Sequence, residues 1–340
     1  MDEAEKQRKG REILSRLLDV VSAGAGMAAP WIPVVFNAAR LAWAALKVSP
    51  TATEGCAPPA LKAPPAATDE CAPPAPNEPP VLAEFPDAPL ELRTYAPVSF
   101  QEAKRQHNTE GIIRRTIEEL KDEQEVPTER PDADWISRFF RIAEDVTTER
   151  MQLLWGRVLA GELKRPGTFS LRTLEVLRNM TQAEAELFRR FARFAFRDGR
   201  QSFLPVTEGR VHFDDGTTVS PSQLRLLGEL GLTEQNKAAP YPMGEAGAPS
   251  EVRASCGTTL LTIRIPSLSS PNSANVLLLT NVGREVCQLI DLAPAPLAHL
   301  RRFARSAQAV GGEVWTALIT EWLSDGGFMN GPLTKLPPEN

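Results

Sequence analysis

A proline-rich stretch divides this chain of 340 residues and limits which parts of it can share one core. Thirteen prolines fall between Pro50 and Pro97, alternating with alanine, and the sequence CAPPA occurs twice. Proline fixes φ and removes a backbone donor, so such a segment forms neither a regular helix nor the interior of a sheet. We therefore predict a disordered linker over 49–97, with a PxxP ligand as the alternative interpretation.

The segment before the linker contains an uncharged run of twenty residues, 20–39. As a helix this run would extend about 30 Å, the thickness of a bilayer core. Pro30 and Pro33 interrupt it, so the pattern predicts two shorter helices in an N-terminal apolar hairpin over 1–48. Burial against protein and association with a membrane are the two interpretations.

The composition excludes several classes of protein. A net charge of −5 argues against non-specific coating of nucleic acid by the whole chain. The four cysteines form no CxxC pair and the three histidines are widely spaced, so we expect no disulfide framework, no metal site and no cofactor. The charged first residues do not make a secretory signal. We expect a cytoplasmic protein, with inner-membrane association as the alternative.

Helical periodicity dominates residues 98–200, which we predict to be a helical core domain. Residues suited to capping mark the expected helix starts. They are Asp132, Thr147 or Thr148, Ser170, and the pair Thr181 and Glu184, which has capping-box spacing.

The pattern changes over 201–325, which we predict to be a winged-helix-like α+β portion, followed by a disordered tail at 326–340. RVHFDDGTTV suggests a hairpin, SPSQLRLLGELGL a capped helix, and TTLLTIRIP and SANVLLLT two strands. Helices are expected at about 295–310 and 312–324. The fold class predicted is mainly α with a small winged-helix-like α+β portion, preceded by the apolar helical hairpin and the Pro/Ala-rich linker.

Catalytic signatures are missing from the sequence. It contains no P-loop, no G-x-G-x-x-G, no H-E-x-x-H and no G-x-S-x-G. The acidic pairs Asp132 with Asp134 and Asp214 with Asp215 suit helix capping and turn formation, with metal or acid–base work as the alternative. We predict that the protein is not an enzyme; a site assembled from distant residues is the alternative.

Two further polar residues lie near the end of one expected helix and the start of the next. Glu162 is expected to form an ion pair with Arg172, with a functional carboxylate as the alternative. Ser170 is expected to cap a helix, since no histidine lies nearby in sequence to activate it as a nucleophile.

Four arginines follow one expected helix, at positions 189, 190, 193 and 197. A basic helix face suits phosphate, whether of lipid or nucleic acid, and a solvated surface is the alternative. The residues of this face are Arg189, Arg190, Arg193 and Arg197.

The stretch from DWISRFF to RTLEVL resembles a bacterial family of unknown function. The family pattern is D-W-x-x-x-F, then M-Q-x-L-W-x-x-[IVL]-L-A-x-E, then P-G-x-[FY]-S-x-R-T-L. The singled-out matching residues are Asp134, Trp135, Gln152, Trp155, Glu162, Pro166, Gly167, Ser170 and Arg172. The resemblance implies no catalytic residue, and we interpret Trp155, Glu162, Ser170 and Arg172 as a structural lock between two helices.

In plan, the chain is also similar to the abortive-infection alpha proteins of bacteria, which join a helical core to an apolar front segment. That resemblance implies a non-enzymatic phage-defence or stress effector. Its hairpin, residues 11–48, would engage a membrane surface or a protein partner, and the chain would form a homo-oligomer. A winged-helix DNA-binding regulator is the alternative, although the Leu-rich helix at 220–231 predicts weak or no specific DNA binding.

Overall fold

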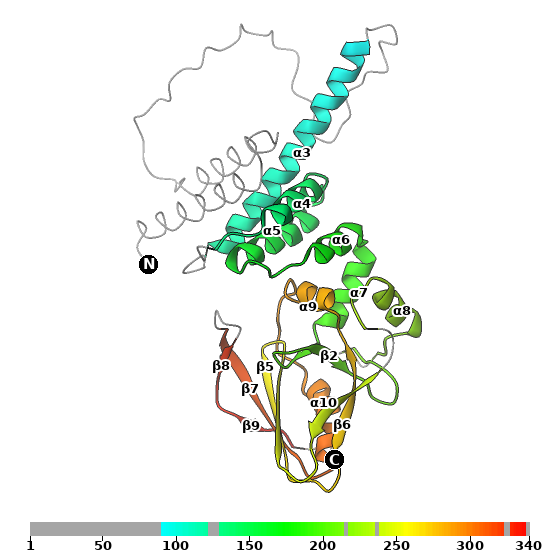
Figure 1. The fold of residues 1–340 in the computed structure, drawn as a ribbon, viewed down its shortest axis with the longest axis vertical. Helices are drawn as coiled ribbons and strands as arrows, with labels where there is room; N and C mark the ends of the chain where they lie inside the picture. The colour runs from blue at the N-terminus through cyan, green and yellow to red at the C-terminus, as the bar shows by residue number, and fades with distance from the viewer. Residues whose placement is uncertain (1–89, 122–128, 214–216, 235–237, 323–326, 338–340) are drawn as a thin grey trace, which may run out of the picture. The chain divides into compact units, whose positions relative to one another are not determined.

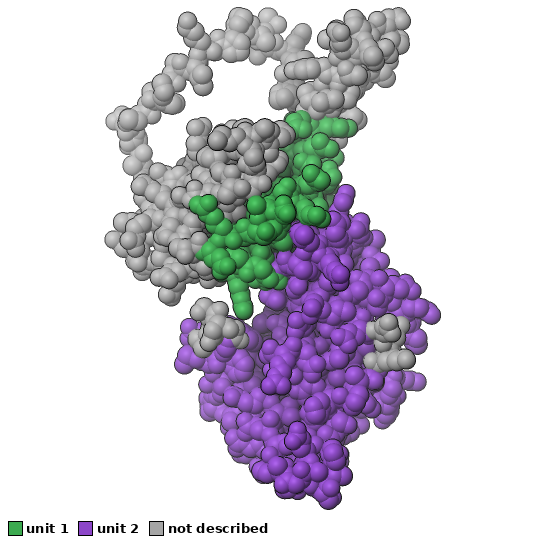
Figure 2. Space-filling view, in the orientation of Figure 1, with its two compact units in different colours: residues 1–168 green, residues 169–340 purple. Residues whose placement is uncertain are grey.

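The computed structural model describes residues 90–121, 129–213, 217–234, 238–322 and 327–337. Its contacts divide the chain into two compact units, the first ending at Thr168 and the second beginning at Phe169 (Figure 1, Figure 2). This division differs from the predicted boundary at 200. The predicted apolar hairpin lies outside the described residues, as does the linker up to residue 89.

The first unit contains three described helices. They are α3 (Leu90–Leu120), α4 (Ala133–Ala143) and α5 (Glu149–Lys164). α3 begins within the stretch that the sequence predicted as linker. It packs along α5 and contacts α4.

A glycine permits the close packing of α3 against α5. A Cβ added at Gly156 would lie 2.6 Å from Cβ of Arg115, closer than two carbon atoms approach without displacement. The Thr116 hydroxyl donates to the Gly156 carbonyl at 3.3 Å, across the two helices. The absence of a side chain at Gly156 therefore sets how near the two helix axes come.

Aromatic side chains fill the core beneath these helices. Trp155 of α5 is fully buried, and its ring centroid lies 5.4 Å from that of Phe139 on α4. Trp135 stacks on Phe139 at 5.2 Å. Trp155 and Phe139 are among the largest fully buried side chains of the described residues, so they anchor α5 to α4.

The second unit joins five helices to a large sheet among the described residues (Figure 1). The helices are α6 (Leu171–Asn179), α7 (Gln182–Ala192), α8 (Pro221–Glu229), α9 (Asn281–Cys287) and α10 (Leu297–Gln308). The first strands are β1 (Phe196–Arg197), β2 (Ser202–Pro205), β3 (Ala239–Gly244) and β4 (Ser250–Cys256). The remaining strands are β5 (Thr259–Ile265), β6 (Asn272–Leu278), β7 (Glu313–Trp322), β8 (Phe328–Asn330) and β9 (Thr334–Lys335).

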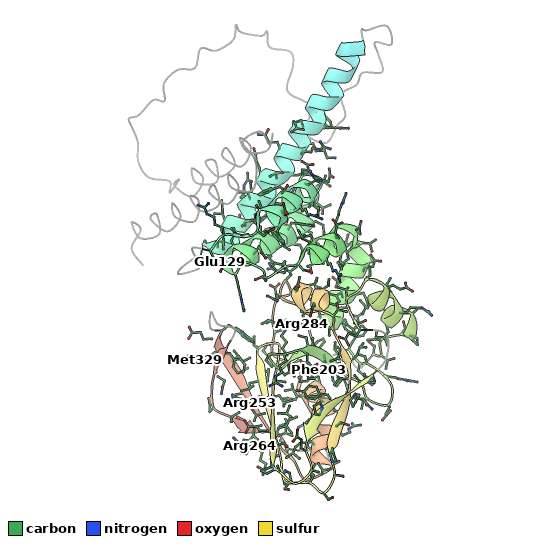
Figure 3. The ribbon with its side chains drawn as sticks, viewed as in Figure 1. Glu129, Phe203, Arg253, Arg264, Arg284 and Met329 are labelled. Atoms are coloured by element: carbon green, nitrogen blue, oxygen red, sulfur yellow. The ribbon has the colours of Figure 1, made fainter. Side chains whose placement is uncertain are left out.

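The strands form one antiparallel sheet in the order β3-β6-β2-β1-β4-β5-β7-β8, and β9 also pairs with β7. α10 contacts β6 as well as β5 and β7, which stand far apart in this order, so the sheet curves around the helix. Phe303 of α10 lies 4.6 Å from Phe196 and 5.2 Å from Phe203, between ring centroids. These rings belong to the core of the second unit, in which Phe203 is labelled in Figure 3.

The prediction of a mainly α fold is wrong, because nine strands of the described residues join one sheet and make a mixed α/β fold. The expected winged helix is replaced by this sheet: β3, which follows α8, pairs with β6 rather than forming a small wing. The stretch expected as a helix at 312–324 is β7, which pairs with β5 through six residue pairs. Valine, tryptophan, threonine and isoleucine favour strands, and burial against a partner strand decided the outcome. β8 and β9 lie within the stretch predicted as a disordered tail.

Local signals were interpreted correctly where the chain caps its helices. Asp132, Thr148 and Ser170 each accept a hydrogen bond from the first turn of α4, α5 and α6. Capping boxes form at α7, from Thr181 and Glu184, and at the start of α8. The backbone hydrogen bond from Thr181 lowers the pKa of Glu184. The hairpin was predicted over 210–219, and His212 and Thr218 form a bridge between its arms; its tip, 214–216, lies outside the described residues.

Candidate functional site

Two segments that are far apart in the sequence meet at the start of α6. One Glu285 carboxylate oxygen accepts hydrogen bonds from the Ser170 backbone N–H and from the Thr173 hydroxyl, both at 2.6 Å. The Ser170 hydroxyl accepts from the Thr173 N–H at 3.3 Å. The first N–H groups of a helix have no partner within the helix and carry partial positive charge, so a carboxylate there is stabilising. We call Ser170, Thr173 and Glu285 the Glu285 cluster.

The short helix α9 places Glu285. Thr280 caps α9 by accepting from the Gly283 N–H at 3.1 Å, and its hydroxyl donates to the Gly231 carbonyl. A Cβ at Gly283 would lie 2.0 Å from the Leu232 carbonyl oxygen, so only glycine allows this approach. The carboxylate therefore reaches α6 because α9 is fixed against the segment that follows α8.

Arg284 ties α9 to the turn between β1 and β2 (Figure 3). Its guanidinium donates to the Arg200 carbonyl and, at 2.8 Å, to the Asn281 side chain. In the same turn Asp198 accepts from the N–H groups of Arg200 and Gln201, at 2.9 and 2.8 Å. The Arg284 and Asp198 side chains thus form hydrogen bonds with the backbone, which is a structural role.

Asp198 also accepts a hydrogen bond from the hydroxyl of Tyr241 on β3, at 3.0 Å. Burial, together with the charge of Asp198, raises the pKa of Tyr241. The phenol therefore stays protonated at neutral pH and acts as a donor to Asp198 rather than as a general base.

Two buried thiols lie near Arg197 on β1. Arg197 donates to the Cys287 carbonyl at 3.0 Å, and its own carbonyl accepts from the Ser255 hydroxyl at 3.4 Å. Burial raises the pKa of Cys256 and of Cys287 to about 12, although the Arg197 charge opposes the shift. Since the thiolate is the reactive form, the raised pKa values disfavour reaction of both cysteines at neutral pH.

The predicted motif residues of the first unit have structural surroundings. The Glu162 carboxylate is buried and accepts from the Gly167 N–H at 2.6 Å, which closes the turn after α5. Gly167 adopts φ of 82°, a conformation that suits glycine, and Pro166 precedes it in that turn. The Gln152 side chain donates to the Val146 carbonyl at 3.2 Å. Asp134 lies in the first turn of α4, where its charge suits the helix dipole.

The four residues predicted to form a lock are divided between the two units. Trp155 and Glu162 belong to the first unit, whereas Ser170 and Arg172 belong to the second. Glu162 closes its own turn, and Ser170 joins the Glu285 cluster instead. Arg172 is exposed in the first turn of α6.

The four arginines proposed as a phosphate-contacting face have different surroundings. Arg189 pairs with Glu186 at 2.6 Å, and that hydrogen bond raises the pKa of Arg189. Arg190 lies over the Phe213 ring at 4.3 Å, and Arg193 over the Phe194 ring at 5.7 Å. Arg197 lies beyond the end of α7, on β1. The four therefore do not form one helix face.

Sequence reasoning missed Glu285, the residue that organises the cluster. Glu285 and Ser170 stand 115 positions apart, so no local spacing connects them. The only signal in the sequence was local. GREV continues the helix that begins at NVG, and that helix itself does not need an acidic side chain at position 285.

Among the described residues, no group of three or more His, Cys, Asp or Glu side chains has the arrangement of a metal site. Within the same part of the chain, no helix combines the length and apolar character needed to cross a bilayer. The uncharged run at 20–39 falls outside the residues to which this finding applies.

Glu285→Ala is expected to lower the free energy of unfolding of the second unit by about 2 kcal/mol, because two donors at the start of α6 lose their acceptor. Glu285→Gln should recover part of the loss, since its amide oxygen still accepts. The measurement is urea denaturation of the full chain. Glu175→Ala, which removes an exposed carboxylate from α6, is the matched control; equal losses in both variants would contradict the role given to Glu285.

Comparison with known proteins gives a family but no function. The profile of a family described as a protein of unknown function, DUF2806, matches residues 93–295. No curated protein and no solved structure matches the chain. The matched range covers more than half of the 340 residues and includes both segments that meet in the Glu285 cluster. The chain therefore belongs to the DUF2806 family.

Proposed function

We propose that the protein is a non-enzymatic effector whose residues 11–48 engage a membrane surface or a protein partner. The observation that carries this proposal is the uncharged run at 20–39, bounded by Asp19 and Arg40. For a run of that length and composition, transfer from water into a bilayer or against another protein is favourable in free energy. The proline-rich segment that follows would connect this element to the folded units.

The polar residues of the family motif support a role in structure. Ser170 is engaged at the start of α6 by Glu285, a residue outside the motif, and Glu162 is engaged with Gly167. The high pKa values of the two buried thiols and of Tyr241 favour their neutral forms. These groups therefore stabilise the units that follow the apolar element.

The setting of this function is proposed from the similarity in plan to the abortive-infection alpha proteins. That similarity supports a bacterial cytoplasmic protein that acts in phage defence or stress. In this proposal the apolar element acts on the membrane or partner, and the folded units control it.

Flotation of the full chain with vesicles of phosphatidylethanolamine and phosphatidylglycerol tests the membrane version. The chain is expected to float, and the double variant Val34→Asp, Val35→Asp is expected to lose most of that binding, because carboxylates are expensive to bury in lipid. The matched control, Ala57→Asp with Ala60→Asp, adds the same charge within the proline-rich segment and should float normally.

The protein-partner version has a separate test. If the full chain does not float, affinity capture from a bacterial lysate should recover a partner that the double variant loses and the control retains. A double variant that keeps both flotation and capture would contradict the proposed role of residues 11–48.

A further inference from the structure

We draw no further inference here: the strongest candidate, the surface patch of exposed apolar side chains on β7 and β8 in the second unit, carries nothing because nothing in the described part of the chain shows what covers it.

Discussion

Trp155→Ala is expected to lower the free energy of unfolding of the first unit by about 3–5 kcal/mol, the usual range for removing a buried large aromatic side chain. Trp155 is fully buried and packs against Phe139, so the substitution leaves a cavity between α5 and α4. Because the chain has two compact units, the circular-dichroism signal of the helices in the first unit should be lost in a separate early phase of urea denaturation.

Leu153→Ala is the matched control for this variant, since Leu153 lies two positions earlier on α5 and is 36% exposed. Its expected loss is below about 1 kcal/mol. A Trp155→Ala protein with normal stability but lost binding or cellular activity would instead assign a functional role to the indole.

Gly156→Leu is expected to cost the first unit about 3 kcal/mol or more, for the opposite reason. Its new Cβ alone would lie 2.6 Å from Cβ of Arg115 and 3.1 Å from the Thr116 nitrogen, so α3 must move away from α5. Overpacking of a tight interface typically costs about 1–3 kcal/mol, and here the obstacle includes backbone, which cannot rotate aside.

Ala103→Leu provides the control, because it adds the same bulk at an exposed position of α3. It should leave the midpoint of denaturation almost unchanged. If Gly156→Leu behaved in the same way, the close packing of α3 on α5 would not be a determinant of stability.

The sequence was most informative where one residue acts on its near neighbours. The caps at Asp132, Thr148 and Ser170 were predictable because each side chain bonds an N–H three residues later. The start of α8 was predictable for the same reason, from the spacing of a serine and a glutamine.

The sheet was harder to predict because its pairings are non-local. β7 was expected to be a helix, yet its residues pair with β5 about fifty positions earlier. β3 contains two prolines and resembles a loop in sequence, although as an edge strand it needs donors on one side only. A strand whose partner is distant gives little local signal, which is why the fold was wrongly expected to be mainly α.

The candidate site was likewise predictable only in its local contacts. Ser170 was correctly expected to be a helix cap, but its second partner, Glu285, comes from a helix that follows six further strands in the sequence. Glu162 was expected near a helix end and lies there, in α5, but its hydrogen bond from the Gly167 backbone is one that no side-chain pattern reveals.

β1, one of the two shortest strands of the sheet, has a mechanical consequence. β1 contains only Phe196 and Arg197, yet in the order of paired strands it joins β3-β6-β2 to β4-β5-β7-β8, through two residue pairs on each side. Few backbone hydrogen bonds cross this seam, so the cohesion of the two half-sheets depends on the aromatic packing of Phe196 with Phe203 and Phe303. When thermal motion or applied force opens the sheet, the seam beside β1 is where the two halves separate first, each as an intact layer.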